Sequence, residues 1–354
     1  MRQPRPSPAR RRARVLTALA AAAALAVAGA QPAAAAAPGY VALGDSFAAG
    51  VGARSYDADS ADCYRSPKGY PALVAARSGL ALTFAACSGA VTADVVEQQA
   101  SALSSSTRYV TLTVGGNDLG FASVLTTCAL PGWLGDCTAA VERGRRTLRT
   151  RLPARLDAVL ATVAARSPRA RVVVTGYPRL FAGDDCNAAT FFSGAEMARL
   201  NAATDELDAL IDARTRAAGF RYVSPVPRFT GHAWCADEAW VNGLSHPALN
   251  SFHPNATGHA AYADLVGPAL LGTARAAVAA PAVRLPDTAG ARTGYPVRTP
   301  DLGTAAVTRA SARAGVTRAE LAQLRHALAS GTSNRELDRL DARITRRAAA
   351  RQDR

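Results

Sequence analysis

Residues 39–47 read Gly-Tyr-Val-Ala-Leu-Gly-Asp-Ser-Phe, an apolar run that ends in a polar turn. A short apolar run bounded by turn residues is typical of a strand that is buried on both faces. The turn places Ser46 at the carboxyl end of this strand, which is the edge where open α/β sheets form their sites. The stretch therefore predicts an α/β fold with Ser46 at its functional edge.

The chain from 38 to 273 repeats this strand pattern, with helix-like stretches between the strands. The expected strands are 39–44, 80–86, 109–114, 171–175 and 220–224, and the expected helices are 71–78, 93–103, 138–166 and 195–217. Regular alternation of strands and helices predicts a parallel sheet that is covered by helices on both faces. The polar residues that follow each strand are then the candidates for chemistry.

The positive charge of the chain is confined to its two ends. The 354 residues carry 41 Lys and Arg against 27 Asp and Glu, for a net charge of +14. Residues 1–37 account for +6 and residues 274–354 for +8, which leaves 38–273 neutral. A groove for nucleic acid needs a basic excess on the folded body, so we do not expect nucleic acid as a partner.

The first 37 residues have the pattern of a cleaved export signal with an Ala-rich pro-region. Arginines in 2–14 precede an apolar run over 15–28, and Ala28-Gly29-Ala30 provides small residues at the expected cleavage site. The apolar run is too short to span a bilayer comfortably. We expect a secreted protein without a transmembrane segment.

The other charged end has two parts. Residues 274–315 are rich in Ala, Pro, Arg, Thr and Gly and read as a linker. Residues 316–354 predict an Arg-rich helical hairpin, because capping boxes begin at Thr317 and Ser333 and leucines recur on one face after each. This segment is expected to dock on the body or on an anionic surface, unless it is only a solvated extension.

Six cysteines lie in the neutral body: Cys63, Cys87, Cys128, Cys137, Cys186 and Cys235. An even number of cysteines in an exported chain indicates disulfides, and the fifteen ways of pairing them stay open. Zinc is disfavoured because no C-x-x-C pair occurs and only His232 lies near a cysteine. No glycine-rich phosphate loop followed by Lys-Ser/Thr is found either, so we expect no metal and no cofactor.

Four polar segments together resemble the parts of an ester hydrolase: Gly44-Asp45-Ser46-Phe47, Cys87-Ser88-Gly89-Ala90, Gly115-Gly116-Asn117-Asp118 and 250–255. Ser46 supplies a hydroxyl, and His253 can take its proton. The backbone N–H groups of Ser46 and Gly89 and the side-chain amide of Asn117 can hold an oxyanion. Each segment alone is ordinary turn chemistry, but the four in this order predict ester hydrolysis.

At these residues the chain resembles the GDSL/SGNH hydrolase superfamily, and within it secreted Streptomyces-type lipases and esterases. The resemblance covers about 38–272 and is carried by 40–52, 86–92, 113–121, 174–179 and 250–258. It implies a three-layer α/β/α sandwich, flavodoxin-like, with a five-stranded parallel sheet. It also implies Ser46 as nucleophile, His253 as base and Gly89 and Asn117 in the oxyanion hole. The disulfides implied are Cys63–Cys87, Cys128–Cys137 and Cys186–Cys235.

One position departs from the family pattern. Where the family often has an Asp three residues before the histidine, this chain has Asn250. Some secreted relatives use a main-chain carbonyl instead, and Ser251 is the expected carbonyl donor, with Asn250 ordering the loop. Asp45 is interpreted as structural. Residues 44–48 also lack the second glycine of the G-x-S-x-G elbow, which separates the chain from the α/β-hydrolase fold.

The predicted function is a monomeric, secreted serine ester hydrolase, a lipase or carboxylesterase that acts on fatty-acyl esters through an acyl-enzyme. Phospholipid hydrolysis, polysaccharide deacetylation and a non-catalytic surface-binding role are the alternatives. Apolar residues in two loops could line an acyl groove, or could instead pack under the disulfide loops: Phe121, Leu125, Leu130, Trp133, Leu134, Phe191 and Phe192.

Overall fold

The computed structural model describes residues 37–186, 190–272 and 301–352. The expected export signal and most of the expected linker lie outside these residues. None of the helices within the described ranges is long and apolar enough to cross a membrane.

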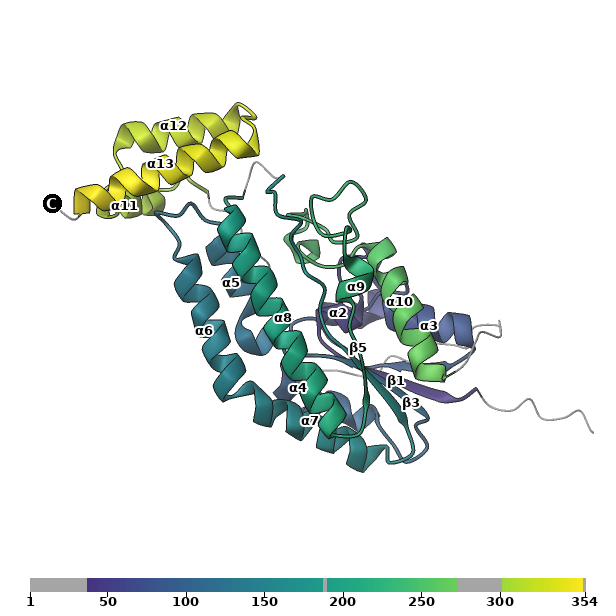
Figure 1. Ribbon diagram of the computed structural model, residues 1–354. Coiled ribbons are helices and arrows are strands. Elements are labelled where there is room, and N and C mark those ends of the chain that lie inside the picture. The colour runs from purple at the N-terminus through teal and green to yellow at the C-terminus, as the bar shows by residue number, and fades with distance from the viewer. Residues whose placement is uncertain (1–36, 187–189, 273–300, 353–354) are drawn as a thin grey trace, which may run out of the picture. The chain divides into compact units, whose positions relative to one another are not determined.

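Five strands form one sheet in the order β2-β1-β3-β4-β5, and every pair is parallel (Figure 1). The strands are β1 (Gly39–Gly44), β2 (Ala81–Phe84), β3 (Tyr109–Thr113), β4 (Arg171–Thr175) and β5 (Arg221–Val223). Tyr40 to Leu43 of β1 are at most 3% exposed, as expected for a central strand buried on both faces. The predicted parallel α/β sheet is confirmed.

Helices cover both faces of the sheet (Figure 1). α3 (Tyr70–Ser78) and α10 (Ala256–Leu271) lie on one face, and α4 (Thr92–Glu97), α7 (Leu152–Arg166) and α8 (Gly194–Ala217) on the other. The remaining helices of the body are α2 (Ser46–Ala49), α5 (Phe121–Cys128), α6 (Cys137–Thr150) and α9 (Val226–Phe229), with 3₁₀ turns η1 (Ala58–Cys63), η2 (Gln99–Ala102), η3 (Asn117–Leu119) and η4 (Ala248–Asn250). The result is the three-layer α/β/α architecture.

The single helix expected over 138–166 is two helices, α6 and α7. Arg151 separates them with φ −122°, and Pro153 stands in the first turn of α7. Proline has no N–H to donate and its ring clashes with the preceding turn, so α6 ends there. A proline at the start of a helix is well tolerated, and α7 begins at Leu152.

The six cysteines form three disulfides in chain order, which are the pairs that the family resemblance implies. They are Cys63–Cys87, Cys128–Cys137 and Cys186–Cys235. The first ties η1 to the loop after β2, and the second links the end of α5 to the start of α6.

The C-terminal segment forms three helices rather than a hairpin of two. They are α11 (Ala305–Arg313), α12 (Arg318–Ala329) and α13 (Asn334–Gln352). α11 lies inside the stretch that was interpreted as a linker. Its first turn is capped by the side chain of Thr304, which favours a helix start at this point. The expected capping box at Thr317 and Glu320 is present. We call residues 301–352 the helical unit.

The helical unit has a core of its own and also contacts the body. Its buried residues include Leu302, Val316, Leu321, Leu324, Leu337 and Ile344. Phe191 joins this cluster, and Trp133 and Leu134 pack against it. The backbone N–H of Gly132 donates to Asp341 Oδ2 of α13 at 2.9 Å. The unit therefore packs on the loop between α5 and α6, as in the docking alternative.

Candidate active site

The strand order brings three polar segments to one edge of the sheet. β1 lies between β2 and β3, with Ala42 opposite Phe84 and Gly44 opposite Thr113. The loops that leave these three strands carry Ser46, Gly89 and Asn117. The chain passes from β1 to β2 on one side and then from β2 to β3 on the other side of β1, and open α/β sheets bind their ligands where the strand order reverses in this way.

Ser46 and His253 form a direct hydrogen bond. The Nε2 atom of His253 lies 2.7 Å from Ser46 Oγ, and its Nδ1 atom lies 2.8 Å from the main-chain oxygen of Ser251. A carbonyl oxygen only accepts, so Nδ1 carries the proton and Nε2 is free to accept the proton of Ser46. Burial lowers the pKa of His253 to about 4, although the bond to Ser251 acts in the opposite direction. The ring is thus neutral near pH 7, as a base must be.

Asn250 orders the loop that holds His253. Its buried side chain accepts a hydrogen bond from the hydroxyl of Tyr56, and the oxygen of that hydroxyl accepts the N–H of Gly52 at 3.1 Å. Gly52 has φ +95°, and a Cβ there would lie 2.3 Å from the carbonyl oxygen of Pro254. Only glycine permits this approach of the two loops. Among the described residues, the hydrogen bonds of the His253 ring join Ser46 and Ser251 rather than Asn250, in keeping with a loop-ordering role.

A left-handed residue turns the same loop toward Ser46. Phe252 has φ +57° and is fully buried, an unusual conformation for a bulky side chain that the surroundings must enforce. Its N–H donates to the Asn242 carbonyl at 3.0 Å, and Asn242 in turn donates its N–H to the His253 carbonyl at 2.9 Å. The two bonds fix the backbone on either side of Phe252, and so fix Ser251 relative to the imidazole.

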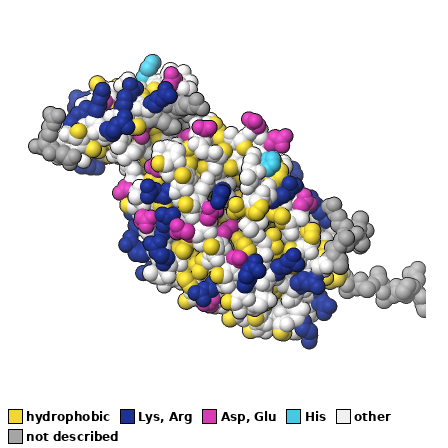
Figure 2. Space-filling model, in the orientation of Figure 1, with side chains coloured by type: hydrophobic (Ala, Val, Ile, Leu, Met, Phe, Trp, Pro, Cys, Tyr) yellow, Lys and Arg dark blue, Asp and Glu magenta, His cyan; other side chains and the backbone are white. Residues whose placement is uncertain are grey.

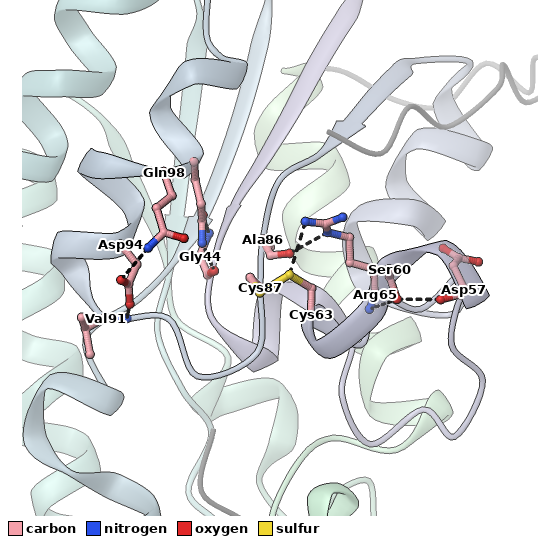
Figure 3. The surroundings of a disulfide bond; sticks show 11 residues. Gly44, Asp57, Ser60, Cys63, Arg65, Ala86, Cys87, Val91, Asp94 and Gln98 are labelled. Atoms are coloured by element: carbon pink, nitrogen blue, oxygen red, sulfur yellow. Dashed lines mark hydrogen bonds between the residues drawn. A yellow bond between two sulfur atoms is a disulfide. The ribbon is translucent and has the colours of Figure 1, made fainter. Parts of the chain in front are cut away.

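The loop that carries Gly89 is held from the side of η1 by the disulfide Cys63–Cys87 (Figure 3). The buried Arg65 donates from Nε to the carbonyl of Ala86 at 2.8 Å. The N–H of Ser88 donates to the Cys63 carbonyl at 3.1 Å. Gly89 itself has φ +80°, a conformation that favours glycine. A rigid frame therefore presents its backbone at the sheet edge.

Hydrogen bonds join the loops after β2 and β3. Asn117 Nδ2 donates to the Ala90 carbonyl at 3.0 Å, and since an amide has two N–H donors, one remains for an oxyanion. Asp118 accepts from the backbone N–H of Thr92 at 3.0 Å and from its hydroxyl at 2.6 Å. Arg155 completes the set with an ion pair to Asp118 at 3.0 Å.

Tyr177 is a site residue that the sequence reasoning missed. Its hydroxyl donates to Asp45 Oδ2 at 2.5 Å and accepts the N–H of Gly116 at 3.0 Å, while its own N–H donates to Asp208 at 2.8 Å. Burial raises the pKa of Asp45 to about 7. Tyr177 thus connects the residue before Ser46 with the residue before Asn117. Its place just after β4, at the same sheet edge, was the available signal.

Asp45 has the structural role expected of it. Its Oδ1 accepts the N–H of Phe47 at 3.0 Å and caps α2. The ring of Phe47 packs against those of Tyr177 and His253, with centroids 5.0 and 5.2 Å apart. Both carboxyl oxygens of Asp45 are thus bound, Oδ1 by the N–H of Phe47 and Oδ2 by the hydroxyl of Tyr177.

A largely apolar pocket opens beside Ser46 between α5, α6 and α8. It is lined by Ser46, Phe47, Asn117, Leu119, Phe121, Val124, Val141, Gly144, Arg145, Leu148, Tyr177, Pro178, Leu180, Leu200, Ala203, Thr204 and Leu207, with Asp45 and Gly116 at its base. The guanidinium of Arg145 is bound by Glu142 at 2.9 Å and Glu206 at 2.8 Å. The positive charge of Arg145 in the pocket wall is therefore compensated by these two carboxylates.

Of the seven apolar residues for which an acyl groove and packing under the disulfide loops were both open, Phe121 alone lines this pocket. Leu125 and Phe192 are buried in the main core. Trp133, Leu134 and Phe191 pack with the helical unit, and Leu130 lies outside the pocket. Most of the set is therefore covered by the main core or by the helical unit.

The other buried histidine, His259, is structural. Its Nε2 atom lies 3.0 Å from the Val51 carbonyl, and burial lowers its pKa to about 4. Within the described ranges, no group of three or more His, Cys, Asp or Glu side chains is arranged to hold a metal ion.

A family model and two curated sequences that match this chain all describe lipases or acylhydrolases. A model of the GDSL-like Lipase/Acylhydrolase family matches residues 42–261. A lipase from Streptomyces rimosus is 43% identical over 221 residues, which are 62% of this chain and 81% of that protein. Lipase 1 from Streptomyces coelicolor is 40% identical over 227 residues, which are 63% of this chain and 83% of that protein.

Two solved structures are similar over their whole length. An extracellular lipase from Streptomyces rimosus has a TM-score of 0.62 and 42% identity, and the match covers 66% of this chain and all of that one. Phospholipase A1 from Streptomyces albidoflavus has a TM-score of 0.61 and 42% identity, with 68% and 100% covered.

Proposed function

The chain belongs to the GDSL-like lipase/acylhydrolase family and is an ester hydrolase, and from this premise we propose that it cleaves fatty-acyl esters through an acyl-enzyme on Ser46. The observation that carries the proposal is the hydrogen-bond chain from Ser46 through His253 to the Ser251 carbonyl, at the mouth of an apolar pocket. The pocket suits a hydrocarbon chain, and the hydroxyl at its edge suits the ester carbonyl.

The reaction follows from the positions of these groups. His253 Nε2 takes the proton of Ser46 as Oγ attacks the ester carbon. The carbonyl oxygen becomes an oxyanion that accepts the N–H groups of Ser46 and Gly89 and the amide of Asn117. His253 returns its proton to the departing alkoxide, which leaves an acyl group on Ser46. Water, deprotonated by the same ring, then releases the fatty acid and restores the serine.

The pocket accounts for the acyl part of the substrate, and the alcohol part distinguishes two candidate substrate classes. Glycerophospholipids are a second candidate, because one relative of 42% identity is named phospholipase A1. Both substrate types present an acyl ester to the same pocket. Release of free fatty acid from a triacylglycerol and from a phospholipid, measured at equal acyl composition, separates the two.

The principal test is hydrolysis of p-nitrophenyl esters of increasing chain length. We expect kcat/KM to rise from acetate to medium-chain esters, because each methylene that enters the pocket is removed from water. Ser46→Ala should abolish turnover and keep the fold, and a serine-directed organophosphonate should label Ser46. An active Ser46→Ala variant, or label on another serine, would refute the assignment.

We also propose that the protein is exported and that residues 38–273 form its catalytic domain. Three disulfides within that range are typical of an oxidising compartment, and a relative of 42% identity is an extracellular lipase. Expression of the full chain should release enzyme into the medium with residues up to the Ala-rich run removed, as N-terminal sequencing can establish. Retention of unprocessed chain in the cells would contradict the export proposal.

A further inference from the structure

α13 presents a row of arginines on one side. Arg339, Arg343 and Arg346 are spaced by four and three residues, which places them on one helix face. All three are exposed, and within the described ranges none of them forms an ion pair. Together with Glu336 and Ala342 they line a shallow hollow. Basic side chains gather on the helical unit on the face that Figure 2 shows.

The orientation of this row is fixed by the opposite face of the helix. Leu337, Leu340, Ile344 and Ala348 of α13 are buried in the core of the helical unit. Arg351, at the end of α13, is bound by Glu320 of α12 at 2.7 Å. Because α13 is held on its apolar side and at its end, the row cannot turn inward. We call Arg339, Arg343 and Arg346 the arginine row.

The same helix connects to the body beside the pocket. Asp341, next to the row in sequence but buried, accepts the N–H of Gly132 in the loop between α5 and α6. α5 and α6 supply Phe121 and Val141, among others, to the wall of the apolar pocket. Whatever the arginine row binds is therefore attached to the enzyme through the segment that joins two pocket helices.

We propose that the helical unit is an adsorption module whose arginine row binds the anionic phosphates of a phospholipid bilayer. Guanidinium groups bind phosphate in a bidentate manner. Seven residues of helix span about 10 Å, so the row can contact several headgroups at once rather than one isolated phosphate. A bilayer as partner rests on the proposed function, since it is a surface on which acyl esters occur. The neutral catalytic body argues against nucleic acid.

The test is co-sedimentation of the full chain with phosphatidylglycerol–phosphatidylcholine vesicles and with vesicles of phosphatidylcholine alone. A Ser46→Ala background prevents hydrolysis of the vesicles. The variant replaces Arg339, Arg343 and Arg346 by Gln. Its matched control replaces Arg309, Arg313 and Arg318, which are exposed arginines of α11 and α12, also by Gln. Both variants remove three charges from the same unit.

We expect the row variant to partition into the anionic vesicles about a hundredfold less, since each basic residue near such a surface contributes about fivefold. The control variant should lose much less of its partitioning into the anionic vesicles. Binding of the chain with its arginine row intact should weaken as the salt concentration increases. Equal losses in both variants, equal binding to the neutral vesicles, or tighter binding to a DNA duplex than to the anionic vesicles would overturn the proposal.

Turnover of a soluble short-chain ester keeps this result separate from the proposed function. With Ser46 intact, the row variant should hydrolyse p-nitrophenyl butyrate as the unmodified chain does, because none of the three arginines lines the pocket. Loss of vesicle binding with this activity retained supports the module. Absence of ester turnover in the unmodified chain would instead contradict the proposed function, whatever the vesicles show.

Discussion

The His253 ring is hydrogen-bonded to the Ser251 carbonyl, whereas the Asn250 side chain accepts from Tyr56, and we propose that the carbonyl orients the ring while Asn250 orders only the loop. We therefore expect Asn250→Ala to lower kcat/KM by about tenfold or less, because the tautomer of the ring is retained. His253→Ala should be nearly inactive, since His253 is the base that is hydrogen-bonded to Ser46 Oγ among the described residues. Ser251→Ala is the control, because it keeps the carbonyl and should stay active. An Asn250→Ala variant as damaged as His253→Ala would mean that the amide does more than order the loop.

The pH profile should reflect the buried imidazole. The pKa of His253 is lowered to about 4 by burial, and the base works only when neutral. The kcat/KM of the free enzyme should accordingly be flat around neutral pH and fall as the pH drops through about 4. Asn250→Asp would place a negative charge near the ring, raise its pKa and move this acidic limb upward. A limb that does not move on this substitution would show that position 250 does not sense the imidazolium.

Tyr177 should act as a positioning residue for the oxyanion loop. Tyr177→Phe removes both the bond to Asp45 and the bond from Gly116, so we expect kcat to fall by about tenfold or more while KM changes little. Tyr40→Phe is a matched control, because Tyr40 is also buried and the hydrogen bond that its hydroxyl makes with a described residue is to Thr111, at 2.7 Å. Equal kcat losses in the two variants would reduce Tyr177 to a packing role.

Among the secondary-structure elements, the loop after β2 depends most on a covalent bond. Replacing both Cys63 and Cys87 by Ala should lower the free energy of unfolding by about 2–4 kcal/mol and also lower kcat, because Gly89 lies only two residues after Cys87 in the same loop. The double replacement of Cys186 and Cys235 is the control, with a comparable loss of stability but little change in kcat. Thermal unfolding and steady-state kinetics measure the two effects, and equal kcat in both variants would contradict a role for the bridge in placing Gly89.

The strands, and the polar residues that come directly after them, could be predicted because both are local patterns in the sequence. Ser46, Gly89 and Asn117 each follow an apolar run, and the parallel sheet then brings them to one edge. The pocket could not be predicted in this way, since it depends on how α5, α6 and α8 pack. The break between α6 and α7 was missed although Pro153 marks it. The sequence left two alternatives open for Trp133 and Phe191, because the helical unit that covers them is distant in sequence and leaves no local signal.

For the whole molecule, truncation after Thr273 should leave turnover of a soluble short-chain ester within about twofold, because every proposed catalytic residue precedes that point. The truncated chain should expose Trp133, Leu134 and Phe191, which pack with the helical unit. We therefore expect it to bind a hydrophobic dye and to aggregate more readily. A large loss of activity on the soluble ester would show that the helical unit supports the α5–α6 wall of the pocket.

The carbonyl partner of His253 has a consequence for how this enzyme tolerates genetic change. A side-chain acid can be lost by one codon substitution, whereas every residue type at position 251 still supplies a main-chain oxygen. The vulnerable point moves to Phe252, whose left-handed backbone directs that oxygen. In a library of random substitutions, position 251 should accept small residues such as Ala with retained activity, because Ser251 is buried, and β-branched residues at position 252 should be depleted.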